Sequence, residues 1–231
     1  MKTTFLFLLG SAFCWGLSSC TAQQPKPEEV IEVINRVNNY WQETHPQHGR
    51  SFWDNAAYHT GNMEVFFLTG NPLYLEKLHE CWTYANSIMY DVEEGLYYRD
   101  GKYVYPKHKS VNGKKDFWAR GDGWVLAALA KVLKDLPETD QYRREYIDRF
   151  RTMAKSVAAC QQPEGYWTRS MLDPKHAPGP ETSGTAFFAY GLLWGMNNGL
   201  LDKAAYQPVV MKAWNYLTTI ALQPDGRIGY V

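Results

Sequence analysis

The sequence has no excess of charge of either sign, because 24 Lys and Arg residues balance 24 Asp and Glu residues. No cluster of basic residues stands out, so a nucleic-acid partner is not expected. The six histidines are scattered, and none belongs to an H-E-x-x-H motif. His79 and Cys81, two residues apart, are too few ligands for a metal site. We therefore expect neither a metal nor a cofactor.

Cysteine is also scarce, with four residues in a chain of 231. Cys14 and Cys20 fall in the N-terminal segment, which leaves Cys81 and Cys160 for the folded part. Two isolated cysteines give no disulfide framework, so the sequence predicts buried thiols.

The segment 1–20 is typical of an export signal, because Lys2 precedes an apolar run, 5–17, that is too short to span a membrane as a resident helix. The next residues, L-S-S-C, have the pattern of a bacterial lipobox, in which Cys20 is lipidated. A plain secretory signal is the alternative. Residues 21–29 are rich in Gln, Pro and Lys and predict a polar tether. The chain is thus expected to be an exported lipoprotein, periplasmic or at the cell surface. Its lipid would be the only membrane anchor of a globular domain over 30–231.

Helical periodicity recurs in seven stretches of this domain. They are 28–44, 54–69, 72–90, 122–136, 139–161, 183–199 and 205–221. The stretches 122–136 and 183–199 are rich in small and apolar residues, as inner helices are, whereas 139–161 and 205–221 carry more charge. This alternation predicts an all-α fold of inner and outer helices, an α/α toroid. A tetratricopeptide-like solenoid is the alternative, but its 34-residue signature is not visible.

A short motif repeats between the predicted helices. E-G-L-Y-Y-R at 94–99 resembles E-G-Y-W-T-R at 164–169 and, more loosely, D-G-R-I-G-Y at 225–230. Each copy places a glycine after a helix and before a short aromatic segment, so we expect short β-hairpins between helices. Repetition of one unit is typical of a closed or stacked helical array.

The segment Asp116–Trp124, D-F-W-A-R-G-D-G-W, carries most of the chemistry in the chain. Tryptophan faces bind sugar rings, and Arg120 offers a planar fork of donors that matches a carboxylate. The glycines allow a tight turn where the backbone approaches a ligand, and Asp122 suits the positive end of the helix that follows. By composition alone, a loop whose aromatic residues cover the core is the favoured interpretation.

W-A-R-G-D-G-W is similar to the W-x-R-G-N-G-W segment of the unsaturated glucuronyl and rhamnogalacturonyl hydrolases, glycoside hydrolase families 88 and 105. From residue 71 onward, T-G-N-P-x-Y-L, G-L-Y-Y-R-D, L-D-P and E-T-S-G-T-A also follow the order of that family. The resemblance implies an (α/α)6 barrel of six helical hairpins. It also implies a substrate, an oligosaccharide that a polysaccharide lyase leaves with a Δ4,5-unsaturated uronic acid at its end. The enzyme would release this sugar by hydrating the double bond.

The resemblance assigns substrate binding to five residues: Trp118, Arg120, Trp124, Ser183 and Thr185. Arg120 and Trp124 match positions that hold the substrate, and Trp118 matches an aromatic residue on the cleft wall. The other two match a polar rim near the uronate carboxylate. Structural alternatives exist, since Arg120 has Asp116 and Asp122 as candidate ion-pair partners and Ser183 is a plausible helix cap.

The sequence departs from the family at the catalytic aspartate, because it has no W-x-D-x-L-x-M segment. Asp54 is the nearest candidate for the acid that protonates C4 and then, as a base, activates the water that adds at C5. Seven helices are too few for six hairpins, so we expect an incomplete barrel with a seam at 71–76, an early end, low stability and little activity. Three hypotheses follow: an active hydrolase that uses Asp54, a catalytically impaired derivative, and a non-catalytic sugar-binding lipoprotein.

Overall fold

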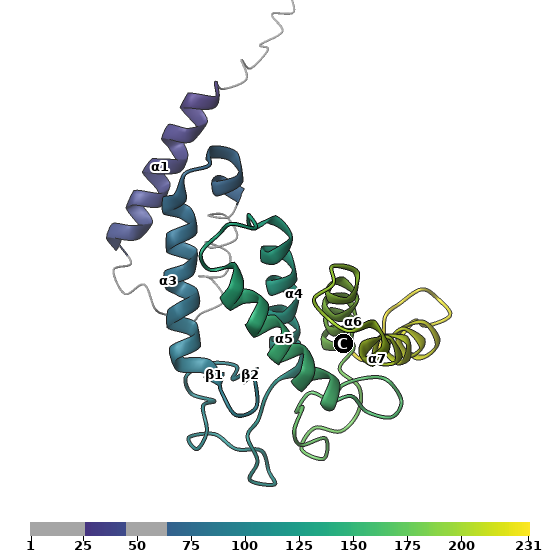
Figure 1. Ribbon diagram of the computed structural model, residues 1–231. Helices are drawn as coiled ribbons and strands as arrows, with labels where there is room; N and C mark the ends of the chain where they lie inside the picture. The colour runs from purple at the N-terminus through teal and green to yellow at the C-terminus, as the bar shows by residue number, and fades with distance from the viewer. Residues whose placement is uncertain (1–25, 45–63) are drawn as a thin grey trace, which may run out of the picture. The chain divides into compact units, whose positions relative to one another are not determined.

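The structure is a computed structural model that describes residues 26–44 and 64–231 (Figure 1). The chain divides into two compact units, Met1–His48 and Gly49–Val231. No helix within the described ranges is long and apolar enough to cross a membrane. Cys20 and Asp54 lie outside the described residues, so lipidation of the first and the acid/base role of the second stay predictions.

The described part of the first unit is helix α1, Pro27–Thr44. Pro27 occupies the first helical position, where its missing N–H is not needed, and Glu28 and Glu29 lie in the first turn. Acidic residues there are favourable because the N-terminal end of a helix carries partial positive charge. The helix predicted over 28–44 is confirmed to within one residue.

The second unit begins, as described, with a helical turn over 64–69, followed by one long helix and a short hairpin. These are α3, Pro72–Met89, and the antiparallel strands β1, Tyr90–Asp91, and β2, Leu96–Tyr97. Asn71 caps α3 through its side chain, which accepts a hydrogen bond from the amide of Leu73 at 3.0 Å. The hairpin forms where the first copy of the repeated motif predicted one.

Four more helices and a π-helix complete the described chain. They are α4, Ala119–Asp135; α5, Arg143–Ala159; α6, Thr182–Asn197; α7, Lys203–Tyr216; and the π-helix Leu217–Ala221. The most extensive helix packing joins α4 to α6, while α5 packs on α4 and α7 packs on α6 (Figure 1). This order matches the predicted alternation of inner and outer helices, and the chain has the all-α, six-hairpin type of fold.

The other two copies of the repeated motif also form turns, but not regular strands. Gly165 and Gly226 both have positive φ, as Gly95 does in the first copy. In the last copy the turn closes with an isolated bridge between Leu222 and Ile228. A Cβ on Gly165 would lie 2.3 Å from the carbonyl oxygen of Lys212, so this turn packs directly on the backbone of α7. The expected hairpins are therefore regular strands only in the first copy.

Candidate functional site

The candidate site lies where the first turns of α4 and α6 meet. Residues 117–119 run antiparallel to 169–171: the amide of Ala119 donates to the carbonyl of Arg169, and the amide of Met171 donates to that of Phe117, both at 3.0 Å. Trp118 has extended backbone angles and is the last residue before the helix. This pairing ends at Ala119, so α4 begins there, three residues earlier than the periodicity predicted.

The two glycines of the W-A-R-G-D-G-W motif consequently lie inside α4, and the tight turn predicted for them is wrong. A Cβ on Gly123 would lie 2.9 Å from the Cβ of Phe187 and 3.3 Å from the Cα of Gly184. One on Gly184 would lie 2.8 Å from the carbonyl carbon of Ala119. These glycines let the backbones of α4 and α6 touch, and that contact brings the two helix starts together.

Arg120 lies at this junction and pairs with neither carboxylate proposed from the sequence. Its Nε donates to Oε1 of Glu181 at 2.9 Å, and its guanidinium lies 5.2 Å from the ring centroid of Trp118. The other carboxylate oxygen of Glu181 accepts from the amide of Gly184 and caps α6. The side chain of Arg120 is still 35% exposed. Arg120 is therefore held in place by two elements while part of it faces solvent.

Trp124 lies one turn further along α4 and is 61% exposed. Its ring contacts that of Phe187, with centroids 4.6 Å apart. Trp118 is half-buried. The structure thus brings Trp118 and Arg120 together, and it leaves Trp124 with an open aromatic face of the kind that sugar rings stack on.

Ser183 and Thr185 lie in the first turn of α6, but Glu181 caps this helix, so the alternative in which Ser183 is the cap is wrong. Ser183 is half-buried. Thr185 is fully buried, and its hydroxyl donates to the carbonyl of Glu181 at 2.9 Å and accepts from the amide of Trp167 at 3.2 Å. Thr185 therefore fastens a core turn to the start of α6, and substrate contact by either residue stays a prediction.

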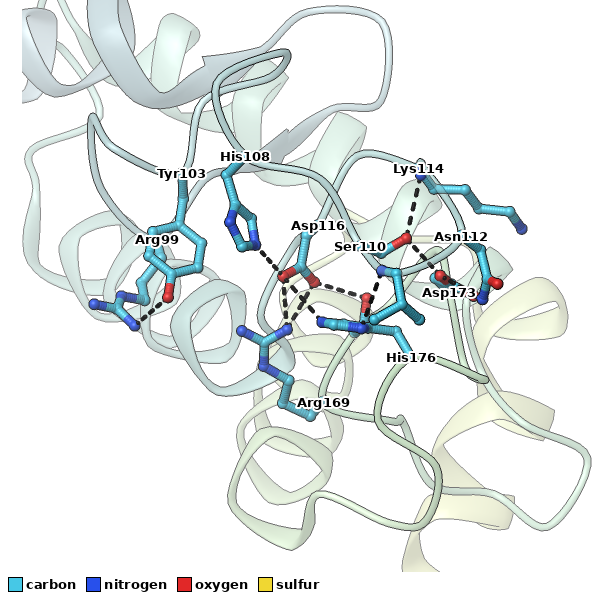
Figure 2. Close-up of polar contacts among 12 residues, drawn as sticks. Arg99, Tyr103, His108, Ser110, Asn112, Lys114, Asp116, Arg169, Asp173 and His176 are labelled. Carbon is cyan, nitrogen blue, oxygen red and sulfur yellow. Dashed lines mark hydrogen bonds and ion pairs between the residues drawn. The ribbon is translucent and has the colours of Figure 1, made fainter.

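A cluster that the sequence did not reveal surrounds Asp116, a buried residue just before α4 (Figure 2). Nη1 of Arg169 donates to both carboxylate oxygens, at 2.7 and 2.8 Å, and the hydroxyl of Ser170 donates at 2.7 Å. Nε2 of His108 lies 3.0 Å from the carboxylate, and Nε2 of His176 lies 3.7 Å from it. The partners of Asp116 come from three separate segments, so local sequence patterns did not predict the cluster. The one sequence signal was the repeated motif that ends in Arg169.

The pKa of Asp116 reflects two opposing effects. Burial alone would raise the pKa of its carboxyl group, but the hydrogen bonds from Arg169, Ser170 and His108 outweigh burial and lower it below the ordinary value. The carboxylate is therefore charged at neutral pH and fully engaged. We infer that it holds the segments around it in place, since it is not free to transfer a proton.

Asp173, in the L-D-P segment, makes a second connection beside this cluster (Figure 2). Its carboxylate accepts a hydrogen bond from the hydroxyl of Ser110. The side-chain nitrogen Nδ2 of Asn112 donates to its two carboxylate oxygens, at 2.9 and 3.0 Å. The amide of Val111 donates to Nδ1 of His176 at 3.2 Å. These contacts bind the loop before α4 to the loop before α6. The two loops that lead to the candidate site are therefore connected to each other by hydrogen bonds.

Two nitrogen-bearing side chains near the start of α4 are partly exposed. Those of Arg120 and His108 have relative side-chain areas of 35% and 33%, and they lie against the carboxylates of Glu181 and Asp116. The described residues hold no group of three or more His, Cys, Asp or Glu side chains placed to bind a metal. An aromatic face beside a positioned guanidinium offers a stacking surface and hydrogen-bond donors for a carboxylate.

The all-α fold of paired inner and outer helices is of the six-hairpin glycosidase type. Solved structures described as possible members of glycoside hydrolase family 105 share this fold. The sequence profile of Glycosyl Hydrolase Family 88 matches residues 28–231, and the chain belongs to that family.

Three similar proteins illustrate the relationship. An unsaturated 3S-rhamnoglycuronyl hydrolase of Formosa agariphila is 39% identical over 167 residues, which are 71% of this chain and 44% of the relative. A solved family 88 glycosyl hydrolase from Bacteroides vulgatus is 57% identical with a TM-score of 0.77, over 90% of this chain and 60% of that one. A solved structure described as a polysaccharide lyase is 54% identical with a TM-score of 0.70, over 88% and 87%. The chain thus spans less than half the length of the curated relative.

Proposed function

We propose that this chain forms part of the active site of a hydrolase that removes a Δ4,5-unsaturated uronic acid from lyase-generated oligosaccharides. The observation that carries the proposal is the placement of Arg120, which is partly exposed and held between the ring of Trp118 and the carboxylate of Glu181. A guanidinium that is positioned before the ligand arrives loses less side-chain entropy on binding. The name of the Formosa agariphila relative supports the same substrate class.

In this proposal Arg120 binds the uronate carboxylate and the exposed face of Trp124 stacks on a sugar ring. Only Nε of Arg120 has a hydrogen bond within the described chain, so its terminal nitrogens are available to a ligand. In the predicted chemistry Asp54 first donates a proton as an acid and then acts as the base that activates water. The hydrogen bonds to Asp116 hold the loops that flank these groups.

A second candidate function, sugar binding without turnover, is favoured by a different observation. The three carboxylates that the described residues place around the start of α4 are all unsuited to proton transfer with a ligand. Asp116 is engaged by Arg169, Glu181 by Arg120 and the amide of Gly184, and Asp122 is fully buried. If Asp54 does not supply the missing group, the chain binds acidic sugars and does not cleave them.

One experiment separates the two functions. Unsaturated rhamnogalacturonan and glycosaminoglycan disaccharides absorb ultraviolet light through their double bond, and hydration removes that absorbance. Loss of absorbance with the wild-type chain that disappears in Asp54→Asn supports the hydrolase. Binding by calorimetry without loss of absorbance supports the second function. A gain of absorbance on intact polysaccharide would instead indicate lyase activity and contradict both.

The role of Arg120 has its own test, with a matched control on α5. Arg120→Ala is expected to weaken binding of unsaturated uronates by about 1.5–3 kcal/mol, the size of a charge-assisted hydrogen bond, and to affect neutral sugars less. Arg144→Ala removes an arginine whose side chain is 87% exposed and paired with Asp148 on the same helix, so it should leave binding unchanged. Equal losses of affinity for acidic and neutral sugars would show that Arg120 does not bind the uronate carboxylate.

A further inference from the structure

Asp122, in the middle of the W-A-R-G-D-G-W motif, has an environment that its predicted role at the helix start does not explain. Its side chain is completely buried. Oδ1 accepts a hydrogen bond from the amide of Tyr97 in strand β2 at 2.8 Å. Oδ2 is buried and has no hydrogen-bond partner among the described residues. This hydrogen bond links the side chain of Asp122 on α4 to the backbone of the β-hairpin, and the other carboxyl oxygen has no donor among the described residues.

No described cation neutralises this carboxyl group. Arg120, on the same helix, is paired with Glu181. The titratable groups that face Asp122 are the phenol of Tyr97, on β2, and the thiol of Cys160, at the end of α5. The charge of Glu94 also acts on this thiol. Arg149, a charged group of α5, acts on Tyr97 and stacks over the ring of Tyr90.

An ionised carboxylate in such a place is unfavourable. Burial without a counter-ion removes the hydration that stabilises the charge, and the neutral form of the acid avoids this loss. The positive end of α4 and the amide of Tyr97 favour the charged form, but each contributes less than the hydration that is lost. Oδ2 has no partner among the described residues in either form, and burying an unpaired neutral O–H costs less than burying an unpaired charged oxygen.

We propose that Asp122 is a positioning residue that carries a proton at neutral pH and, as a neutral acid, fastens strand β2 to the first turn of α4. Arg120 and Trp124 lie two residues to either side, so this contact fixes the turn from which both project.

The direction of the pKa shift agrees with this inference. Burial raises the pKa of Asp122 well above its ordinary value, and the hydrogen bond from Tyr97 offsets only part of the rise. In the unfolded chain the carboxyl group is ionised above its ordinary pKa, so folding takes up a proton. The stability that this group contributes is present below the ordinary pKa and is lost as pH rises toward the folded pKa. Each pH unit in that window lowers the folding equilibrium constant about tenfold.

The first test compares the pH dependence of unfolding in three proteins. Urea unfolding of the wild type, Asp122→Asn and Asp135→Asn is measured from about pH 5 to about pH 7, above the ordinary aspartate pKa. Asp135 is an exposed residue at the other end of α4 and serves as the matched control. We expect Asp122→Asn to lose the tenfold change per pH unit and Asp135→Asn to keep it. Equal pH slopes for the wild type and Asp122→Asn would overturn the proposal.

Two further measurements keep the proposal testable if Asp122→Asn folds poorly. The wild type at neutral pH should show the infrared carbonyl band of a protonated carboxyl group shielded from water, and its absence would refute the proposal. Hydrogen exchange reports the contact itself: the amide of Tyr97 should exchange at least tenfold faster in Asp122→Ala than in the wild type, and Asn should restore protection. Unchanged exchange in the alanine variant would show that Asp122 does not fasten the strand.

Discussion

Gly123 offers the sharpest test of how packing builds the candidate site. A methyl group added at this position would lie 2.9 Å from Cβ of Phe187 and 3.3 Å from Cα of Gly184 on α6. Neither atom belongs to the flexible end of a side chain, so the methyl group fits only if the two helices move apart. Gly123→Ala should therefore destabilise the protein and disturb the pairing of Arg120 with Glu181.

The magnitude follows from two opposing effects. Replacing glycine by alanine inside a helix stabilises the helix by up to about 1 kcal/mol. Overpacking a close contact costs about 1–3 kcal/mol, and a contact with backbone lies in the upper part of this range. The net expectation for Gly123→Ala is a loss of about 1–2 kcal/mol, which lowers the melting temperature by roughly 2–8 °C in a chain of this size.

Gly121→Ala is the matched control, because it lies in the same helical turn with more space around it. The nearest atom to its added methyl group is Cε3 of Trp118 at 3.6 Å, an ordinary van der Waals distance. This variant should be as stable as the wild type or more stable by up to about 1 kcal/mol. Urea unfolding followed by circular dichroism measures both variants. If Gly123→Ala proves as stable as Gly121→Ala, the close approach of α4 and α6 is not what constrains this position.

Two other predictions concern the groups around the site. Asp116→Asn should lower stability at neutral pH by about 1–3 kcal/mol, because it removes a buried partner of the half-exposed Arg169. Since the folded pKa of Asp116 is depressed, its contribution is present above the ordinary aspartate pKa and is lost as pH falls through the folded value. The difference between Asp116→Asn and the wild type in urea unfolding should therefore shrink in acid, and a constant difference would contradict the ion pair. Trp124→Ala should change stability by no more than about 0.5 kcal/mol, since the ring is mostly exposed, yet weaken binding of acidic and neutral sugars alike in calorimetry. A large loss of stability would identify Trp124 as a structural residue.

The sequence by itself determined the helices within the described residues and the type of fold, whereas most of the helix predicted over 54–69 lies outside those residues. Helix periodicity, Pro72 at a helix start and Gly199 after α6 are local features, and each acts within a few residues of itself. The resemblance of W-A-R-G-D-G-W to a family motif located the residues of greatest interest. The interpretation of this segment as a loop is wrong from Ala119 onward. Pairing with the distant segment 169–171, and not local preference, decides where α4 begins.

Only the tertiary structure decided the partners of the charged residues. Arg120 had two acidic neighbours in sequence but pairs with Glu181, 61 positions away, and Asp116 pairs with Arg169, 53 positions away. Asp122 was expected at the positive end of a helix and as a candidate partner of Arg120, yet it is buried and accepts a hydrogen bond from strand β2. Such pairings depend on which helix faces touch, and here the contact of two glycine-containing turns sets that geometry. Local sequence preferences extend over about one helical turn, so they define the elements, whereas side-chain partners are fixed only when those elements pack.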